Sequence, residues 1–267
     1  MELGLKNKVV LVTGASKGIG KAIAQAFAAE GSRVAISARG QEELQRAAQE
    51  IGKSTGAEVI GVAADMTQAN DIRRLVDEVG KRWGTVHVLV NNAGGVGEFA
   101  GFDELTDQDW LDILNLNLMS AVRATRAVLP FMRRQKWGRI LNISSESGTQ
   151  PDAFMPHYNA SKAALNSLTK SLSKAYASDG ILVNTVSPAF IMTPLVADLL
   201  HKMAKEQGIS AEEVTAQFLA KNRPHIELKR PGESEEVAPA VVYLASEAAS
   251  FITGTNLRVD GGSVASV

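Results

Sequence analysis

The chain has 267 residues, of which 45% are hydrophobic and 21% are charged, and its net charge is −1. This profile is typical of one soluble α/β domain, and the scattered charges exclude a basic surface for nucleic acid or an anionic membrane. The chain has no cysteine, which excludes disulfides, a thiolate nucleophile and a cysteine-bound zinc site. Because no run has the apolarity of a signal peptide or a membrane span, we expect a cytoplasmic protein without a membrane partner.

Short runs rich in Val, Ile and Leu alternate with longer helical patterns along the chain. The predicted strands are Lys8 to Thr13, Arg33 to Ala38, Glu58 to Ala63, Val86 to Asn91, Gly138 to Ser144, Ile181 to Ser187 and Thr255 to Asp260. The predicted helices between them include Gly18 to Glu30, Gln41 to Ile51, Gln68 to Trp83, Asp107 to Met132 and Pro156 to Ala177. Nearly continuous apolar strands are typical of a parallel sheet that helices cover on both faces. We therefore predict a single-domain, doubly wound Rossmann fold over residues 1–267, with a seven-stranded parallel sheet.

One segment, about residues 190–230, does not follow this alternation of strands and helices and lies between the sixth strand and a later helix. Its pattern is mainly helical, and a connection this long is usually functional. It carries the apolar residues Phe190, Met192, Leu195, Val196, Leu199, Leu200, Met203 and Phe218. We predict a helical lid that places an apolar cover over the substrate, although half of these side chains could equally pack against the domain.

A glycine-rich motif from Thr13 to Gly20 follows the first strand and opens the first helix. The unpaired N–H groups and the positive end of a helix suit a pyrophosphate. The spacing is G-x-x-x-G-x-G, a variant of the commoner dinucleotide fingerprint. The motif therefore predicts a cofactor site that uses Gly14, Ser16, Lys17, Gly18, Ile19 and Gly20.

The end of the second strand bears on which dinucleotide binds. NAD-binding sites commonly place a carboxylate there for the ribose hydroxyls, whereas a cation suits the 2′-phosphate of NADP. This chain has Ala38 followed by Arg39, and Lys17 stands in the glycine motif. We therefore prefer NADP(H), with NAD(H) as the alternative.

A second motif supplies a proton donor. Tyr158 and Lys162 are four residues apart and so share one face of a helix, and Ser145 stands thirteen residues before the tyrosine. A nearby ammonium favours the phenolate, so we expect Lys162 to lower the pKa of Tyr158 and make it a general acid or base. Ser145 is placed to stabilise negative charge on a carbonyl oxygen.

Together these motifs resemble the short-chain dehydrogenase/reductase family over essentially the whole chain, including Asn91 to Gly94 after the fourth strand. The resemblance implies that Ser145, Tyr158 and Lys162 form the catalytic group. It also implies that Asn117 completes a tetrad by kinking its helix and holding a water that relays protons to Lys162. Asn115 is a nearby competitor for this position.

The same resemblance implies further cofactor contacts. They are Asp65 and Met66 at the adenine, Asn92, Ala93 and Gly94 at the ribose, Tyr158 and Lys162 at the nicotinamide ribose, and Pro188, Ala189, Ile191 and Thr193 around the nicotinamide. Asn91 is expected to brace the central strands instead. One departure is visible, because the family commonly has Pro-Gly where this chain has Pro188 and Ala189.

The predicted function is an NADP(H)-dependent oxidoreductase that transfers a hydride between nicotinamide and a carbonyl or secondary alcohol. The pattern is closest to 3-oxoacyl carrier-protein reductases, so reduction of a 3-oxoacyl thioester is the alternative, although Asp179 stands where those enzymes tend to carry a base. A cofactor-free lyase of the haloalcohol-dehalogenase kind and an NADP sensor are more remote alternatives. Glu146 and Gln150 are the polar candidates for recognising a small-molecule substrate. The four histidines show no metal-ligand spacing, so we expect no metal site.

Members of the family are usually homo-oligomers, so the resemblance also implies a dimer or a tetramer.

Overall fold

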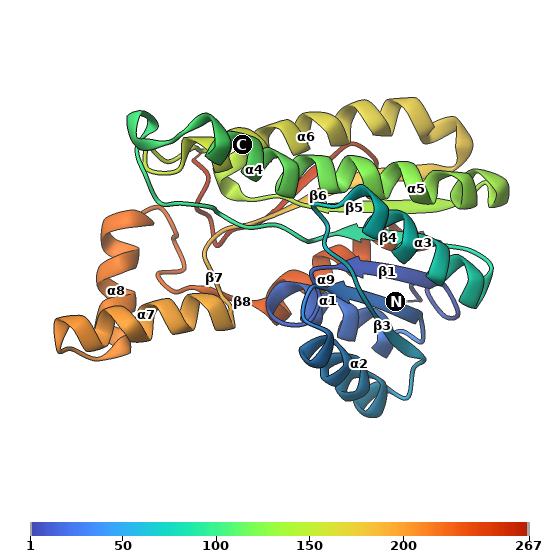
Figure 1. Ribbon diagram of the computed structural model, residues 1–267, viewed down its shortest axis with the longest axis horizontal. Helices are drawn as coiled ribbons and strands as arrows, with labels where there is room; N and C mark the ends of the chain where they lie inside the picture. Colours follow the sequence, from blue (N-terminus) through green and yellow to red (C-terminus); the bar gives the residue numbers. More distant parts are fainter. Residues whose placement is uncertain (1, 266–267) are drawn as a thin grey trace.

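The computed structural model describes residues 2–265 and centres on one parallel sheet of seven strands (Figure 1). The strand order is β3-β2-β1-β4-β5-β6-β9. The strands are β1 Val9–Thr13, β2 Arg33–Ala38, β3 Val59–Ala63, β4 Val88–Asn91, β5 Gly138–Ile143, β6 Ile181–Pro188 and β9 Asn256–Val259. The order reverses direction between β1 and β4, so the loops that follow these two strands diverge at the carboxyl edge. The predicted sheet is confirmed, with strand ends shifted by one or two residues.

Helices cover both faces of the sheet, as the continuous apolar strands require. The main helices are α1 Gly18–Ala29, α2 Gln41–Thr55, α3 Ala69–Trp83, α4 Asp107–Leu114, α5 Ser120–Gln135, α6 Pro156–Tyr176 and α9 Ser234–Ala245. One core joins α1, α2 and α9 to the sheet through residues such as Ile23, Leu44 and Val241. The other core joins α3 and α5 to the opposite face, with Leu75 and Val128 among its members.

The predicted helix from Asp107 to Met132 is helical throughout, and it is irregular around Asn117, as the family resemblance implied. A π-helical segment, Asn115–Met119, separates α4 from α5. Within it the side chain of Asn117 is buried and makes hydrogen bonds with the backbone of Gly95 instead of facing solvent. A π-bulge of this kind is common at functional sites, because the extra residue turns a side chain out of the helical repeat.

The segment after β6 forms a helical hairpin that projects beyond the carboxyl edge of the sheet (Figure 1). Its helices are α7 Pro194–Gln207 and α8 Ala211–Asn222. Two short strands that the sequence did not predict, β7 Ile191–Met192 and β8 Gly232–Glu233, pair in parallel at its base.

The hairpin has a small core of its own, in which part of the predicted apolar set packs, and its role as a lid remains a prediction. Leu200, Ala204 and Val214 are buried in it, and the partly buried residues packed against them include Phe190, Met192, Val196, Met203 and Phe218. Of the predicted apolar set, Leu195 and Leu199 are exposed. Two amphipathic helices of a hairpin bury their apolar faces against each other, which accounts for this core. Across residues 2–265, no helix is both long enough and apolar enough to cross a bilayer.

Candidate active site

The glycine turn after β1 leaves the N-terminus of α1 open. Lys17 occupies the N-cap position and makes no side-chain capping bond, whereas Thr106, Thr193 and Ser210 cap α4, α7 and α8. Gly14 has a φ of +63° and a Cβ there would lie 2.8 Å from the Cα of Ala93, so the close approach requires glycine. An uncapped helix end beside such a turn fits a pyrophosphate.

Polar side chains at the end of β4 hold this turn in place. The Thr13 hydroxyl accepts hydrogen bonds from the backbone N–H groups of Asn92 and Ala93, at 3.1 and 3.0 Å. The Asn92 amide donates to the carbonyls of Thr13 and Gly14, at 2.9 and 2.8 Å. The Asn92 side chain therefore braces the turn, so a ribose contact from this position falls to the backbone. Asn91 braces the strands as predicted, with a 2.8 Å bond from its Nδ2 to Asn142 Oδ1.

The predicted 2′-phosphate cations lie on the outer side of the glycine turn. Arg39 is exposed just beyond β2, and the Lys17 ammonium lies 3.8 Å from a carboxylate oxygen of Glu43. The Ser16 hydroxyl donates to the other oxygen of Glu43 at 3.0 Å. Ser16, Lys17 and Glu43 line a groove with Arg46 of α2. The sequence prediction missed Glu43 and Arg46 because they come from the helix after β2 rather than from a motif.

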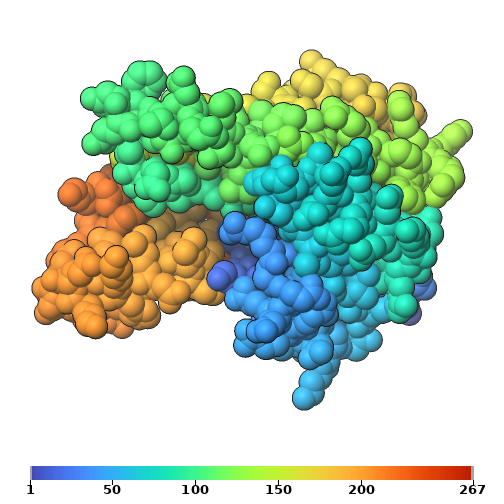
Figure 2. Space-filling model, in the orientation of Figure 1, coloured from blue at the N-terminus to red at the C-terminus, as the bar shows by residue number. Residues whose placement is uncertain are grey.

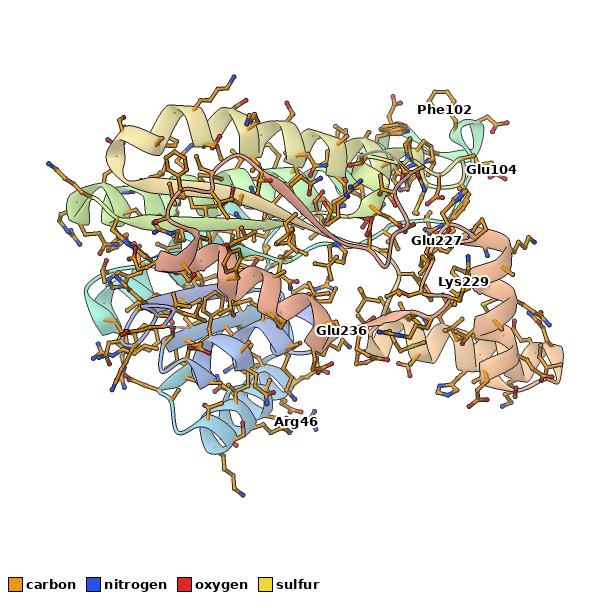
Figure 3. The ribbon with its side chains drawn as sticks, turned by 180° about the vertical axis from the view of Figure 1, so that it is seen from behind. Arg46, Phe102, Glu104, Glu227, Lys229 and Glu236 are labelled. Atoms are coloured by element: carbon orange, nitrogen blue, oxygen red, sulfur yellow. The ribbon has the colours of Figure 1, made fainter. Side chains whose placement is uncertain are left out.

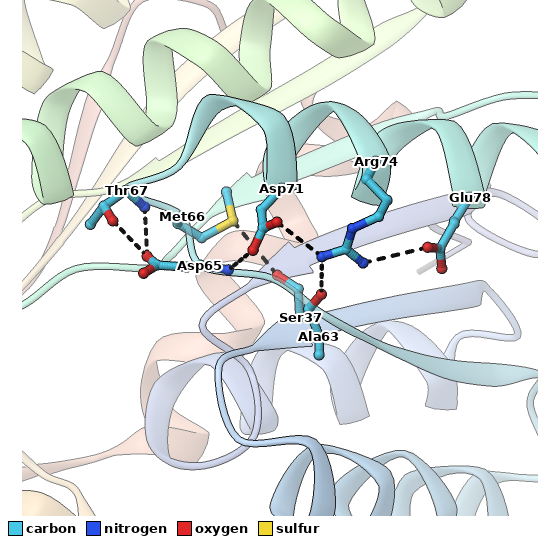
Figure 4. Close-up of polar contacts among 8 residues, drawn as sticks. All are labelled: Ser37, Ala63, Asp65, Met66, Thr67, Asp71, Arg74 and Glu78. Atoms are coloured by element: carbon cyan, nitrogen blue, oxygen red, sulfur yellow. Dashed lines mark hydrogen bonds and ion pairs between the residues drawn. The ribbon is translucent and has the colours of Figure 1, made fainter.

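Asp65 and Met66 lie in a rigid turn between β3 and α3 (Figure 4). One Asp65 oxygen accepts hydrogen bonds from the N–H and hydroxyl of Thr67, at 2.9 and 2.8 Å. The Asp65 backbone N–H donates to Asp71, and this bond lowers the pKa of the Asp71 carboxyl. Met66 is buried with its sulfur 3.9 Å from the Ser37 hydroxyl. The predicted adenine contact remains a prediction, and the turn offers mainly its backbone for it.

The Ser145 and Tyr158 hydroxyls meet at the carboxyl edge of the sheet. Ser145 follows β5 and caps a short 3-10 helix, Glu146–Gly148, by accepting from the Ser147 N–H at 3.2 Å. Pro156 occupies the first turn of α6 and so sets Tyr158 at the start of this helix. The Ser145 hydroxyl is close enough to the Tyr158 hydroxyl to act on its pKa.

The environment of Tyr158 corrects the predicted effect of Lys162. Burial raises the pKa of Tyr158 above its ordinary value, and the hydrogen bond with Ser145 and the charge of Arg223 only partly oppose this effect. The Lys162 ammonium lies 5.7 Å from the centre of the Tyr158 ring and donates to the Ile143 carbonyl at 2.9 Å. Burial lowers the pKa of Lys162 to about 8. Tyr158 is therefore held in the protonated form at neutral pH.

Asn117 and Gly94 complete the surroundings of Lys162. The Asn117 amide donates to the Gly95 carbonyl and to the Ser161 hydroxyl, both at 2.9 Å. A Cβ at Gly94 would lie 2.9 Å from Asn117 Oδ1 and 3.4 Å from Lys162 Nζ. Asn115 points elsewhere, since its oxygen accepts from Arg123 at 2.6 Å. Of the two asparagines, the structure brings Asn117 to Lys162.

The residues predicted around the nicotinamide lie at the base of the hairpin. Pro188 ends β6, and the Ala189 N–H donates to the Val259 carbonyl at 3.2 Å. Ile191 is buried in β7, and Thr193 caps α7. A Cβ at Gly18 would lie 3.3 Å from the Thr193 methyl group, so the start of the hairpin contacts the glycine turn.

A recess lies between the hairpin, the loop after β4 and the N-terminal third of the chain (Figure 2). Seen from behind, Phe102 and Glu104 of this loop and Glu227 and Lys229 after α8 lie at the same end of the molecule (Figure 3). The sequence prediction missed Arg223, which contacts both Glu146 and Asp152 beside the candidate catalytic residues.

The comparisons with known proteins agree with this geometry. Residues 8–204 match the short chain dehydrogenase family. The chain belongs to the short-chain dehydrogenase/reductase family. Family membership makes it an oxidoreductase that acts on carbonyl or alcohol groups.

Similar proteins span the whole chain. The oxidoreductase YvrD of Bacillus subtilis is 38% identical over 267 residues and 100% of both chains. The 3-oxoacyl-[acyl-carrier-protein] reductase FabG of Aquifex aeolicus is 37% identical over 262 residues, covering 98% of this chain and 99% of FabG.

A solved structure, L-sorbose reductase from Gluconobacter frateurii complexed with NADPH and L-sorbose, has a TM-score of 0.95 at 33% identity and covers 100% of both chains.

Within residues 2–265, no three His, Asp or Glu side chains gather as a metal site would require.

Proposed function

We propose that this short-chain dehydrogenase/reductase is an NADP(H)-dependent reductase that converts a ketone to a secondary alcohol with Tyr158 as general acid. One observation carries the proposal. The Tyr158 hydroxyl lies beside Ser145 at the same sheet edge as the uncapped N-terminus of α1. A dinucleotide on α1 and a carbonyl at Tyr158 would then meet at one site.

Bound NADPH supplies the hydride that the carbonyl carbon receives. Tyr158 donates its proton to the carbonyl oxygen, and Ser145 donates a hydrogen bond to the same oxygen as charge develops on it. The raised pKa of Tyr158 means that this proton donor is protonated at neutral pH. Lys162 would hold the ribose hydroxyls of the bound cofactor, and Asn117 would position the relay that returns a proton to Tyr158.

Cations around the outer groove support NADP(H) over NAD(H). Lys17 and Arg46 line this groove, and Arg39 is exposed at the end of β2, where no carboxylate stands. The similar L-sorbose reductase was solved with NADPH. A 2′-phosphate would gain charge-assisted bonds from these side chains.

Reduction of a 3-oxoacyl thioester is the second candidate function, because the chain is similar to FabG. An acidic carrier protein requires free basic residues near the site mouth. Asp179 stands where those enzymes tend to carry a base, and it is paired with Arg133 at 2.7 Å. A free ketone is the preferred substrate for this reason.

The test begins with separate fluorescence titrations of NADPH and NADH at matched ionic strength, followed by NADPH-dependent reduction of ketones and acyl thioesters. We expect tighter NADPH binding, lost with Arg39→Ala. Tyr158→Phe should keep NADPH affinity and lose at least about 100-fold in kcat, while Tyr176→Phe at the far end of α6 serves as the control. Unchanged turnover in Tyr158→Phe would remove this residue from its role. Binding of a nucleotide without turnover would support the NADP sensor. If neither nucleotide binds, the cofactor-free lyase is supported.

We also infer a homo-oligomer built on α5 and α6. Ala163, Ser167 and Ser171 are exposed at intervals of four residues on α6 and give it a smooth stripe for helix packing. Light scattering after size exclusion should give a mass of two or four chains, and Ser167→Glu should reduce it. A wild-type monomer would contradict this inference.

A further inference from the structure

A buried arginine anchors the end of the hairpin to the catalytic side of the domain. Arg223 is the C-cap residue of α8, and its side chain is 12% exposed. Its Nε lies 3.1 Å from Glu146 Oε1. Its Nη2 lies 2.9 Å from Asp152 Oδ2, and its Nη1 donates to Asp152 Oδ1 at 3.1 Å. One guanidinium therefore joins two carboxylates from a distant part of the chain, and all three of its nitrogens take part.

Glu146 connects Arg223 to the segment that carries Ser145. Glu146 is the first residue of the short 3-10 helix that Ser145 caps, and its carboxylate is buried. A Cβ at Gly148, the last residue of this helix, would lie 2.9 Å from the backbone carbonyl carbon of Lys162, so the helix packs directly on α6. A shift of Glu146 would therefore move the Ser145 hydroxyl relative to α6.

Asp152 connects Arg223 to the segment that leads into Tyr158. The Asp152 backbone carbonyl accepts a hydrogen bond from the side-chain amide of Asn159 at 2.6 Å, and Asn159 directly follows Tyr158 in the first turns of α6. The Phe154 ring lies between these points in the sequence, with its centre 5.7 Å from the Arg223 guanidinium. Arg223 thus contacts the approach to α6 through a carboxylate and an aromatic ring.

The hairpin is held at its start as well as at its end. At its start, a Cβ at Gly18 would lie 3.3 Å from the methyl group of Thr193, the residue that caps α7. At its end, Arg223 binds the segments of Ser145 and Tyr158. The hairpin therefore spans from the glycine turn to the catalytic side, and a movement of its end would withdraw the guanidinium from both carboxylates.

Withdrawal of Arg223 would also change the charge around Tyr158. Burial raises the pKa of Tyr158, and among the neighbouring charges Arg223 lowers this pKa whereas Glu146 and Asp152 raise it. Without the guanidinium, two carboxylates that are largely buried would lose their partner, which is strongly unfavourable. The docked position of the hairpin is therefore favoured by charge as well as by contact.

We propose that Arg223 is a positioning residue that aligns Ser145 and Tyr158 when the hairpin is docked, so that undocking of the hairpin leaves the reductase inactive. This inference rests on the proposed ketone reductase activity and adds the hairpin to its machinery. Arg223 acts through Glu146 and Asp152 rather than on a reacting atom. Glu146, a polar candidate for substrate recognition in the sequence, is buried and bound to Arg223 instead.

Two variants of Arg223 separate its charge from its shape. Arg223→Gln removes the charge, whereas Arg223→Lys keeps the charge but loses the planar fork that reaches both carboxylates. Arg230→Gln is the matched control, because Arg230 binds both oxygens of Glu236 at 2.7 Å in the exposed segment after the hairpin.

The full-length proteins are assayed with NADPH and three carbonyl compounds: 2,3-butanedione, L-sorbose and acetoacetyl-CoA. The kcat is counted per NADPH-binding site, from the stoichiometry of a fluorescence titration, so that unfolded protein does not contribute. Amide hydrogen exchange in α8 reports whether the end of the hairpin is docked.

Arg223→Gln should lower kcat per site at least about tenfold, since a misplacement of about 1 Å at a catalytic group can cost 100-fold. The Kd of NADPH should change less than about threefold, because the contact between Thr193 and the glycine turn is kept. Arg223→Lys should stay at least about fivefold below wild type in kcat, because an ammonium cannot bridge both carboxylates with the same geometry. Exchange in α8 should be faster in both variants, and Arg230→Gln should match wild type throughout.

The possible failures are distinguishable. A wild-type kcat per site in Arg223→Gln, or a restored kcat in Arg223→Lys, would overturn the positioning role and leave the reductase standing. Equal losses of kcat and NADPH affinity would also overturn it, since they indicate a general structural role. If Arg223→Gln does not fold, Arg223→Lys decides. If the wild type reduces none of the three compounds, the proposed function fails, and exchange in α8 still decides whether Arg223 docks the hairpin.

Discussion

Gly94 lies so close to Asn117 that a single methyl group would disturb the candidate relay. A Cβ at Gly94 would be 2.9 Å from Asn117 Oδ1 and 3.4 Å from Lys162 Nζ. Asn117 cannot swing away freely, because both of its amide atoms are bonded to the backbone of Gly95. Glycine is therefore required at this position because a side chain would displace Asn117 and Lys162, and not because of its own backbone conformation.

Gly94→Ala should lower kcat for ketone reduction by at least about tenfold, since a misplacement of about 1 Å at a catalytic group can cost 100-fold. The matched control is Gly52→Ala in α2, where a Cβ meets only the Ala57 carbonyl at 3.4 Å. Steady-state kinetics at saturating NADPH would measure both variants. If Gly94→Ala and Gly52→Ala have the same kcat, the contact with Asn117 is without consequence.

Lys162 is predicted to reduce stability in exchange for activity. Its pKa is lowered by burial to about 8, against an ordinary value of 10.5. Between these values the unfolded chain binds more protons than the folded chain, so the unfolding free energy should rise with pH from about 8 to 10.5 on account of this group.

Lys162→Met should therefore be more stable than wild type at pH 7, by about 1–2 kcal/mol after the lost bond to the Ile143 carbonyl is counted. The difference should shrink as the pH approaches 10.5, and the variant should be inactive. Urea unfolding at pH 7, 9 and 10.5 would measure it. A variant that is less stable than wild type at pH 7 would contradict the buried-charge penalty.

The sequence predicts the sheet and the catalytic group because both depend on local patterns. Continuous apolar runs such as Val9–Thr13 mark buried parallel strands, and glycines mark where they end. Tyr158 and Lys162 share a helix face at a spacing of four residues, so their neighbourhood follows without tertiary information.

What the sequence could not predict depends on long-range packing. The sign of the pKa shift of Tyr158 is a balance of burial against several charges, and the ammonium of Lys162 points to the carbonyl of Ile143 instead. Arg223 reaches Asp152 across 71 residues of chain. The π-helical segment at Asn117 is held by contacts with the loop after β4, which helical periodicity does not reveal, and only the family resemblance implied a kink there.

Glu43 is expected to weaken NADPH binding. Its carboxylate accepts a hydrogen bond from Ser16 at 3.0 Å and lies 3.8 Å from the Lys17 ammonium, so it competes with a 2′-phosphate for both groups. Glu43→Gln should lower the Kd of NADPH by about two- to fivefold, because the pair is exposed and screened. The Kd of NADH should stay the same.

Glu50→Gln is the matched control, since Glu50 binds Lys21 in the same groove at 2.5 Å. Fluorescence titration at low and high salt would measure all three proteins, and added salt should shrink the gain of Glu43→Gln. Equal changes in the affinities for NADPH and NADH would show that Glu43 acts on the shape of the turn and not on the 2′-phosphate.

The two asparagines of the π-helical segment give the sharpest comparison. Asn117 is 2% exposed and makes three hydrogen bonds, with the N–H and carbonyl of Gly95 and with Ser161. Asn115 is half-buried and holds Thr67 and Arg123 at the surface of the fold. Both lie in one segment, so Ala substitution removes the same atoms from two different surroundings.

Asn117→Ala should cost about 1–3 kcal/mol of unfolding free energy, because the half-buried N–H and carbonyl of Gly95 lose their partners. It should also lower kcat at least about tenfold by freeing the backbone beside Lys162. Asn115→Ala should stay within about 1 kcal/mol of wild type and keep its kcat. Urea unfolding and steady-state reduction decide between them, and the reverse order would assign the relay position to Asn115.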